Sequence, residues 1–585
     1  MGNTFKYQES LPKLPIPDLN ETCDRFIQWV EPLLTVQQFE ITKRIANEFK
    51  NKEGDGQKLQ RVLKEFSEKN NLENWIAPFW YDVYLKPRVP LIEEGNVFYL
   101  LENKQNNCTL TQLELATSLI LSVLKFKELI DNEELAVDMQ KDQPLCMDQY
   151  KKFFSSTRIP QNQRDNLRVS SFEKHIIVLY KENIFVLNVY DNLEIKTYNQ
   201  IKCELENIIS EDSKGQGLGI LTSMNRDMWA DSRDRLLNID DQNKGNLEKI
   251  ETAIFALCLD DSSPEILKDV SENMLYGNGK NRWFDKSLQF IITRNGYIGF
   301  NMEHTGMDGS PISKMIKYIY DDTDSNISKN NVKKDIDKPE KLKFVINDEL
   351  TEMLNIASEK FHDIISDNET RVLVFDQFGT NKIKKFQISP DAFVQLAIQL
   401  AQYKIFDKCF SQYEAVATRK FLYGRMEVMY AVSNESLRFI ESFTSNCNNN
   451  EYKKILLINA TQKHIERIRE CQEGKGVDGH LMGLLEMYNR FGKEIGIDKM
   501  PALFKDEGYK TLTHSTICTS TTSTHGLQLA GWGPVVEDGF AIRYMKYKDE
   551  IRFNIMSRKY NEKNLDKLTN YIKESLLEMA KLMEV

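Results

Sequence analysis

Residues 287–309 read SLQFIITRNGYIGFNMEHTGMDG, and this stretch carries the strongest fold signal of the chain. Two β-rich arms flank Asn295-Gly296, a dipeptide that favours the tight turn of a β-hairpin. The second arm ends at Glu303 and continues into a glycine-bearing turn that holds His304 and Asp308. A strand end fixes a side chain firmly, and glycines in the turn keep it within reach of a ligand. The stretch therefore predicts a hairpin that presents a histidine.

Strands and helices are expected on both sides of this hairpin. Strand-like runs cover 175–180, 183–190, 251–259, 371–376, 527–531, 540–544 and 550–556. Helical patterns cover 108–130, 390–408 and 453–471, and a C-terminal amphipathic helix begins near residue 561. The polar, charged segment 321–343 is typical of a linker or a surface excursion. This order predicts an α/β fold with two domains of similar build, 1–345 and 346–585, each a mixed β-sheet flanked by helices.

The composition excludes several classes of function. At 585 residues the chain is too long for one hydrophobic core, and no apolar run approaches the roughly 20 residues of a membrane-spanning helix. The N-terminal residues lack the apolar region of a secretory signal. Nine cysteines without C-x-x-C spacing favour reduced thiols over disulfides or zinc, and a net charge of −10 disfavours nucleic acid. We expect a cytoplasmic monomer without a metal, a permanently bound cofactor or a membrane span.

His304 is the most suggestive of the seven histidines. An imidazole suits proton abstraction near neutral pH, and the carboxylate of Asp308 can orient it. The alternative is a surface histidine in an ordinary turn, and on residue types alone that alternative is favoured. His464, in a charged helix, is interpreted as structural or solvated, and His480, at the start of an apolar turn, as a satisfied core histidine.

Two further patterns suggest ligand contacts, each with a plainer alternative. A run of hydroxyl side chains follows Cys518 up to Thr524, and Gly531-Trp532-Gly533 comes soon after. Hydroxyls can donate to an oxyanion, although such a run is more often a flexible polar loop. Lys382, Lys384 and Lys385 precede a helix and suit phosphate binding, although lysine runs are usually solvated.

Taken in order, many segments resemble the carnitine and choline acyltransferase family over almost the whole chain. The matching segments are LPKLPIPDLNET (11–22), PLCMDQYKKFFSSTRIP (144–160), LGILTSMNRDMWADSR (218–233), GNGKNRWFDKSLQFI (277–291), EHTGMDG (303–309), SPDAFVQLAIQLAQYK (389–404), YEAVATRKFLYGR (413–425), GHLMGL (479–484) and GWGPVVEDGF (531–540). The resemblance implies two domains related to chloramphenicol acetyltransferase, with an active-site tunnel at their interface. Coenzyme A and an alcohol would enter from opposite ends, and His304 would act as general base without an acyl-enzyme.

The resemblance also implies roles for residues around this histidine. Ser520 matches the last residue of a Ser-Thr-Ser motif that stabilises the oxyanion, and the first position of that motif is Cys518 here. Coenzyme A positions are matched by Lys384, Lys385 and Asp391. A further family lysine corresponds to Thr380, for which Lys382 is the expected substitute.

The alcohol site resembles that of choline acetyltransferases, whereas the rest is similar to carnitine palmitoyltransferases. Carnitine enzymes hold the substrate carboxylate with Tyr, Thr and Arg, and this chain has Tyr413, Met426 and Gly479 at those positions. Losing the charged partner of a buried carboxylate costs about 3–5 kcal/mol. The resemblance therefore favours choline over carnitine as the alcohol.

The aromatic wall for the quaternary ammonium is expected from Trp532, with Tyr84 and Trp80 as further candidates. Ala530, followed by Gly531, stands where acetyl-specific members have a bulky residue, so the resemblance implies medium or longer acyl groups. Two alternatives stay open. One is a carnitine enzyme whose carboxylate is bound by Lys475 or Arg425, and the other is a catalytically silent ligand-binding protein.

Overall fold

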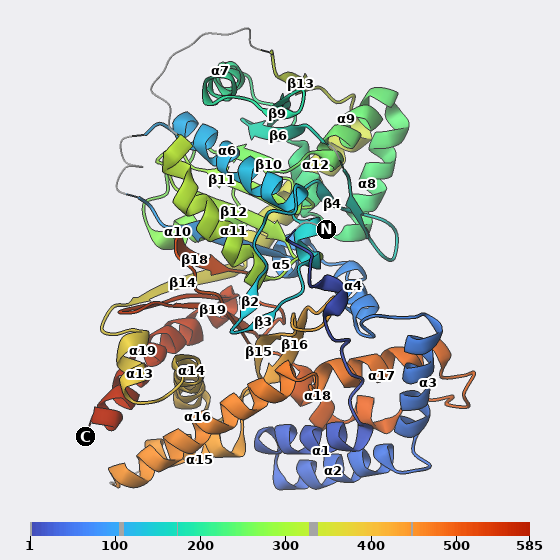
Figure 1. Cartoon of the computed structure of the whole chain (residues 1–585), viewed down its shortest axis with the longest axis vertical. Helices are drawn as coiled ribbons and strands as arrows, with labels where there is room; N and C mark the ends of the chain where they lie inside the picture. Colours follow the sequence, from blue (N-terminus) through green and yellow to red (C-terminus); the bar gives the residue numbers. More distant parts are fainter. Residues whose placement is uncertain (1–2, 105–109, 172, 327–336, 446–448, 585) are drawn as a thin grey trace.

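The strands form two large mixed sheets that are flanked by helices, one in the upper and one in the lower part of Figure 1. The computed structural model describes residues 3–104, 110–171, 173–326, 337–445 and 449–584. In spatial order the first sheet contains β13 (Glu340–Leu342), β7 (Asn183–Asn188), β6 (His175–Tyr180), β10 (Ala256–Leu259), β11 (Leu288–Ile292), β12 (Ile298–Glu303), β1 (Asn96–Leu101) and β18 (Leu527–Gly531). The second contains β14 (Asn368–Phe375), β20 (Ile551–Arg558), β19 (Phe540–Lys546), β17 (Ile517–Thr521), β15 (Gln412–Ala417) and β16 (Met426–Tyr430).

Helices surround both sheets, and three short strand pairs complete the fold. The helices are α1 (Leu19–Val30), α2 (Val36–Lys50), α3 (Asp55–Lys69), α4 (Ala77–Leu85), α5 (Leu91–Glu94), α6 (Gln112–Asp131), α7 (Tyr198–Ile209), α8 (Arg226–Ile239), α9 (Asp241–Thr252), α10 (Leu267–Leu275), α11 (Gly309–Asp322), α12 (Asp348–Ser366), α13 (Thr380–Lys385), α14 (Pro390–Phe406), α15 (Asn434–Thr444), α16 (Asn450–Gln472), α17 (Asp478–Phe491), α18 (Glu507–Thr513) and α19 (Glu562–Glu584). The short pairs are β2 (Met139–Gln140) with β3 (Gln143–Pro144), β4 (Ser156–Ile159) with β5 (Asn166–Val169), and β8 (Tyr190–Asp191) with β9 (Glu194–Ile195). The predicted α/β class is confirmed.

The predicted hairpin lies at the centre of the first sheet. Strands β11 and β12 pair antiparallel, with Ile292 opposite Ile298. Gly296 in the turn has φ 88°, and its N–H donates to the carbonyl of Thr293 at 3.0 Å. A positive φ of this size favours glycine because other residues place a Cβ against the backbone there. The Asn-Gly signal therefore predicted this turn correctly.

Three stretches differ from the prediction. Of the predicted strand 251–259, the first two residues end helix α9, and strand β10 begins only at Ala256. The hydroxyl run was predicted as a flexible loop, but Ile517–Thr521 form strand β17 between β15 and β19. Neighbours on both sides pair its backbone groups, and β-branched threonines suit a pleated strand. Within the predicted linker, Glu340–Leu342 form the edge strand β13 beside β7. Residues 327–336 of that segment lie outside the described residues.

The boundary at residue 345 stays a prediction, and two segments cross it in space. Strand β18 pairs antiparallel with β1 and thereby joins the first sheet, with Ala530 opposite Tyr99. Helices α1–α3 lie beside α17 and α18 in Figure 1, and one hydrophobic cluster contains both Trp29 and Leu484. The two halves therefore share strands and a core.

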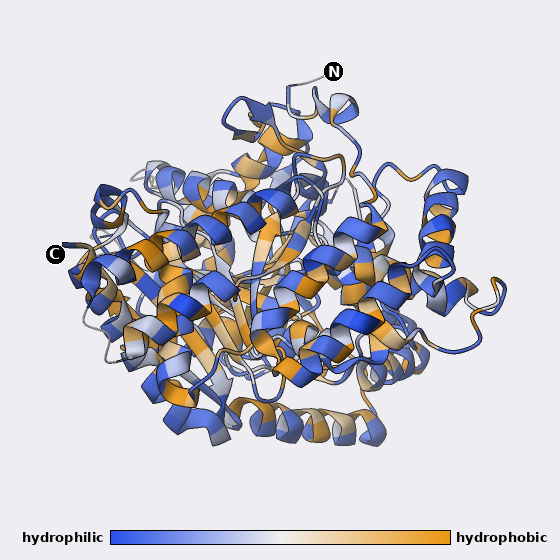
Figure 2. Cartoon of the chain, turned by 90° about the horizontal axis from the view of Figure 1, so that it is seen from below, coloured by the Kyte–Doolittle hydropathy of each residue, from blue (hydrophilic) through white to orange (hydrophobic). Residues whose placement is uncertain are grey.

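Hydropathy is distributed as a packed interior requires. Figure 2 shows hydrophobic residues on the sheets and the inward helix faces, with hydrophilic residues on the outside. Burial of such apolar surface is the main stabilising term in folding. No helix in the described parts of the chain is long and apolar enough to cross a membrane.

Gly296→Ala tests the hairpin. We expect it to lower the free energy of unfolding by about 1 kcal/mol or more, since alanine at this φ is strained. Gly245→Ala is the matched control. Gly245 lies within α9 with open space around its Cβ position, so alanine there should stabilise by about 0.5–1 kcal/mol. Urea denaturation followed by circular dichroism measures both, and equal stability of Gly296→Ala and the native protein would contradict the assigned turn.

Candidate active site

A cavity of about 430 Å³ lies between the two sheets and collects most of the predicted site residues. Among the predicted residues, those that line it are His304, Ser520, Tyr84, Trp80, Tyr413, Met426 and Trp532. They come from α4, the end of β12, strands β15, β16 and β17, and the residue after β18. Segments far apart in sequence therefore converge on one cavity, as a binding site requires.

The imidazole of His304 lies at the cavity wall. Its ring stacks on Tyr84, with centroids 5.2 Å apart, and its Nδ1 lies 3.9 Å from Asp308 Oδ1. Nδ1 is buried, so the 23% exposure of the side chain comes from its other atoms. Burial lowers the pKa of His304, although the Asp308 carboxylate partly opposes this effect. A proton on Nδ1, facing Asp308, leaves the lone pair of Nε2 to accept a proton from a ligand.

Arg425 fixes the turn that carries His304. It binds Asp308 through two bonds of 2.9 Å, and it donates to the carbonyls of Thr305 at 2.6 Å and His304 at 3.1 Å. Gln149 adds a bond of 2.8 Å to the same carboxylate. Against the effect of burial, Arg425 holds the pKa of Asp308 below its usual range. Arg425 is therefore occupied by the turn and is not free to bind a ligand carboxylate.

Ser520 lines the cavity beside an arginine that the sequence did not single out. Arg543 Nη1 donates to Ser520 Oγ at 2.6 Å, and the two residues face each other in the β17–β19 register. Because Ser520 Oγ accepts from arginine, its own proton is free to point elsewhere. This geometry suits the predicted donation to an oxyanion.

The opposite end of the cavity is acidic and aromatic. Tyr430 donates to Asp478 at 2.6 Å, and both residues line the cavity with Tyr413 and Met426. Tyr413 Oη lies 3.6 Å from Met426 Sδ. Burial raises the pKa of Asp478. The polar contact expected from a threonine is thus replaced by a thioether.

Gly479 lies behind this end and not on the cavity wall. Its N–H donates to Glu427 Oε1 at 2.9 Å, and a Cβ on Gly479 would lie 2.8 Å from Glu427 Oε2. Burial and the nearby Asp478 raise the pKa of Glu427 to about 8. Among the described residues, neither Glu427 nor Asp478 has a salt-bridge partner. The site of the family's arginine therefore holds uncompensated acid.

The predicted acyl-pocket residues lie within the sheet. Ala530 and Gly531 pair with Tyr99 and Phe98 of β1. A Cβ on Gly531 would meet Asn554 Nδ2 at 2.3 Å. The space beside Gly531 is thus occupied by Asn554 and Phe98, and the acyl-pocket role of Ala530 and Gly531 stays a prediction.

The predicted coenzyme A residues lie away from the cavity. Lys384 and Lys385 are exposed on α13, whereas Lys382 is ion-paired with Glu584 at 2.8 Å. Asp391, in the first turn of α14, accepts from Tyr544 at 2.9 Å and contacts Lys546. None of these positions is tested by the geometry, and all stay predictions.

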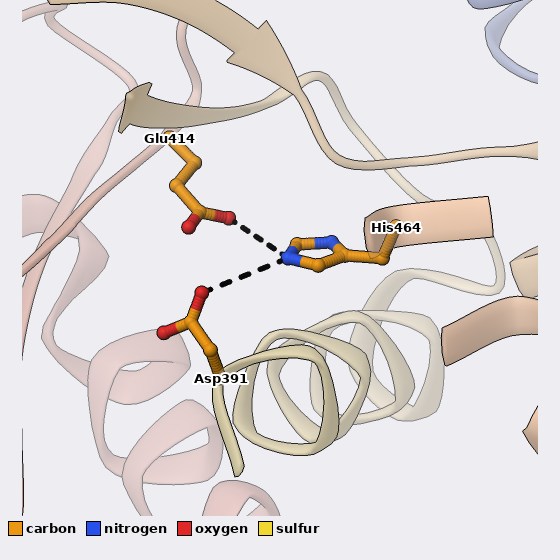
Figure 3. A group of neighbouring side chains, drawn as sticks. All are labelled: Asp391, Glu414 and His464. Atoms are coloured by element: carbon orange, nitrogen blue, oxygen red, sulfur yellow. Dashed lines mark ion pairs between the residues drawn. The ribbon is translucent and has the colours of Figure 1, made fainter. Parts of the chain in front are cut away.

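Asp391 also belongs to a buried cluster with Glu414 and His464 (Figure 3). His464 Nε2 lies 3.2 Å from Glu414 and 3.8 Å from Asp391. Despite burial, Glu414 and Asp391 raise the pKa of His464 to about 9. The three side chains have the spacing of metal ligands, but the imidazolium and Lys546 already balance the carboxylates. His464 is therefore structural and buried, which corrects the solvated alternative.

His480 is the satisfied core histidine that the sequence predicted. It bonds Thr22 and Gln60, each at 2.7 Å, and burial lowers its pKa to about 3.

Sequence reasoning missed Arg543, Asp478 and Glu427. Arg543 did leave a signal, because an arginine inside the apolar strand FAIRYM is rarely buried without a function. The sequence gives no comparable signal at Asp478, because an acidic residue in the first turn of a helix is common.

Comparisons with known proteins agree with the resemblance. A family profile described as choline/carnitine O-acyltransferase matches residues 14–574. The chain is 33% identical to the carnitine O-acetyltransferase of Columba livia, over 100% of this chain and 95% of that protein. It is 30% identical to the choline O-acetyltransferase of Sus scrofa, over 98% and 93%. It is also 29% identical to the mitochondrial carnitine O-palmitoyltransferase 2 of Homo sapiens, over 99% and 93%. The three sequence identities differ by only a few per cent, so they do not decide whether the alcohol substrate is carnitine or choline.

Three histidines should titrate in separate ranges. We expect a pKa near 9 for His464, near 3 for His480, and below the usual value of about 6.5 for His304. NMR of ring-labelled histidine, assigned with single His→Gln variants, measures all three.

Asp308→Asn should lower the pKa of His304 further, because the carboxylate that raises it is lost. The same change leaves Arg425 buried without its partner, so the free energy of unfolding should fall by about 3–5 kcal/mol. Asp138→Asn is the control, since Asp138 pairs with Arg419 at 2.7 Å outside the cavity. If the pKa of His304 is the same in Asp308→Asn and in the native protein, Asp308 does not influence the protonation of His304.

Proposed function

Because the chain belongs to the choline/carnitine O-acyltransferase family, we propose that it transfers an acyl group between coenzyme A and a quaternary amino alcohol that lacks a carboxylate, such as choline. The chain is thus an O-acyltransferase, and acyl-coenzyme A is its co-substrate. We choose choline because Asp478 and Glu427, at one end of the cavity, have no salt-bridge partner among the described residues.

In the proposed reaction His304 Nε2 accepts the proton of the alcohol hydroxyl. The alcohol oxygen attacks the thioester carbonyl, so that a C–O bond forms and the C–S bond breaks. The departing thiolate of coenzyme A takes the proton back from the imidazolium. Ser520 donates to the carbonyl oxygen while it carries negative charge. The lowered pKa of His304 keeps the base neutral before the reaction.

A cationic alcohol fits the acidic end. Asp478 lies on the cavity wall with Glu427 behind it, and a bound ammonium would lower the pKa of both groups and favour their ionised forms. Tyr413 and Tyr430 supply aromatic surface nearby. Trp532 and Tyr84 are less suited, because the guanidinium groups of Arg543 and Arg425 already lie 5.8 Å and 5.4 Å from their rings. The tyrosine end is therefore our proposed ammonium site.

Carnitine fits this end poorly, because its carboxylate would face Asp478. Lys475 and Arg425, the two cations considered as partners for the carnitine carboxylate, each already pair with an acid. Lys475 is exposed and paired with Glu473 at 2.8 Å, and Arg425 is engaged by Asp308. Carnitine acyltransfer is therefore the second candidate.

For coenzyme A, we propose that the exposed Lys384 and Lys385 bind its phosphates. Lys382 can contribute only if it leaves Glu584.

His304→Ala tests catalysis itself. We expect kcat to fall about 10²–10⁴-fold, which is the usual contribution of a general base. The control is His362→Ala, which alters an exposed residue of α12. Thiol release from acetyl-coenzyme A with choline is the assay. Unchanged turnover in His304→Ala would remove this residue from the mechanism, and no turnover in the native protein with either alcohol would support the silent ligand-binding alternative.

The choice of alcohol has its own test. The native protein should use choline with a higher kcat/KM than carnitine. Met426→Thr combined with Gly479→Arg should raise kcat/KM for carnitine about tenfold or more, since the new arginine gives Glu427 a partner and the carboxylate a cation. Lys475→Gln is the control and should leave the ratio unchanged. A native preference for carnitine would overturn the proposal.

A further inference from the structure

Arg543 is a buried cation on the cavity wall without an acidic partner. It lies in the middle of β19 and is 5% exposed. No carboxylate of the described residues forms a salt bridge with it, and Asp308, the acid next to the nearby Gly309, is bound by Arg425. Burying an unpaired charge is strongly unfavourable unless a bound anion compensates it.

The contacts of Arg543 are all with neutral groups. One terminal nitrogen donates to Ser520 at 2.6 Å, and the other donates to Thr522. The rings of Tyr99 and Trp532 lie 5.7 and 5.8 Å away. Nε is buried and has no hydrogen-bond partner. The side chain therefore retains both an uncompensated charge and a free donor.

Arg543 and the acidic end lie on opposite sides of the cavity. In the second sheet the order β19, β17, β15, β16 places three strand spacings, about 14 Å, between the backbone of Arg543 and that of Glu427. Arg543 lies next to Ser520 and over β18, where the acyl group is expected, and its register partner Asn554 touches Gly531. Carnitine, whose ammonium and carboxylate are separated by only three carbons, is too short to reach both ends.

We propose that Arg543 is an anion subsite at the acyl end and binds a carboxylate at the far end of the acyl group. The preferred donors would then be coenzyme A thioesters of short dicarboxylic acids, because Arg543 lies only one hydrogen bond from Ser520. This inference rests on the proposed function. The transfer step is unchanged, since the distal carboxylate forms no bond and only holds the acyl group.

Succinyl-coenzyme A and butyryl-coenzyme A form a matched pair, since both acyl chains have four carbons and only one ends in a carboxylate. With choline as acceptor, the native protein should have the higher kcat/KM for succinyl-coenzyme A. In Arg543→Gln the succinyl-to-butyryl ratio should fall about 10- to 100-fold, as expected for a lost hydrogen bond to a charged group. Arg543→Lys, which keeps the charge without the planar fork, should restore part of the ratio.

The control is Arg552→Gln on the next strand, whose arginine pairs with Glu102 and Glu550 outside the cavity. Its donor ratio should equal that of the native protein, and thermal unfolding checks that all variants fold. A native preference for butyryl-coenzyme A would overturn the inference. So would an equal loss with both donors in Arg543→Gln, which would assign the arginine to the oxyanion through Ser520.

Repeating both donor assays with carnitine, for all four proteins, separates this inference from the proposed function. The donor ratio at a fixed alcohol tests Arg543, whereas the alcohol ratio at a fixed donor tests the acidic end. If carnitine turnover depends on Arg543 with both donors while choline turnover does not, the carboxylate belongs to the alcohol and the inference is wrong.

Discussion

The ion pair between Arg425 and Asp308 joins the two halves of the chain beside His304. Asp308 precedes α11 and Arg425 precedes β16, so neither half alone can form the pair. The same guanidinium binds the backbone carbonyls of Thr305 and His304. The orientation of His304, the proposed base, thus depends on one buried contact. A buried ion pair adds little to the free energy of folding compared with well-packed apolar side chains. Removing one partner is costly because the other charge stays buried, and this cost keeps the two side chains together.

Charge is distributed unevenly around this centre. One end of the cavity carries Asp478, with Glu427 behind it, and the other carries Arg543. In water such charges would matter little, but at low dielectric an uncompensated charge strongly favours a ligand of opposite sign. A substrate pair with a cation on the alcohol and an anion on the acyl group would neutralise both ends. Such a pair would give the buried Arg543 guanidinium an anion, and it would give the carboxyl groups of Asp478 and Glu427, whose pKa values are raised, a cation.

Local sequence signals predicted much of this structure. The Asn295-Gly296 turn and the strands β19 and β20 follow from short-range pattern, and His304 stood out as a polar residue at a strand end. The hydroxyl run near Ser520 was harder, because its strand conformation depends on neighbours distant in sequence. The pairing of β18 with β1 joins residues more than 400 positions apart, and no local pattern encodes such a contact. Arg543 and Asp478 can be singled out only in the folded chain, where both are on the cavity wall without a salt-bridge partner among the described residues.

A crystal structure with choline bound would test the central claim directly. The account predicts the ammonium beside Asp478 among the tyrosines, with the hydroxyl within hydrogen-bond reach of His304 Nε2. The opposite placement, with the ammonium against Trp532 and Asp478 empty, would contradict the assignment of the acidic end to the alcohol.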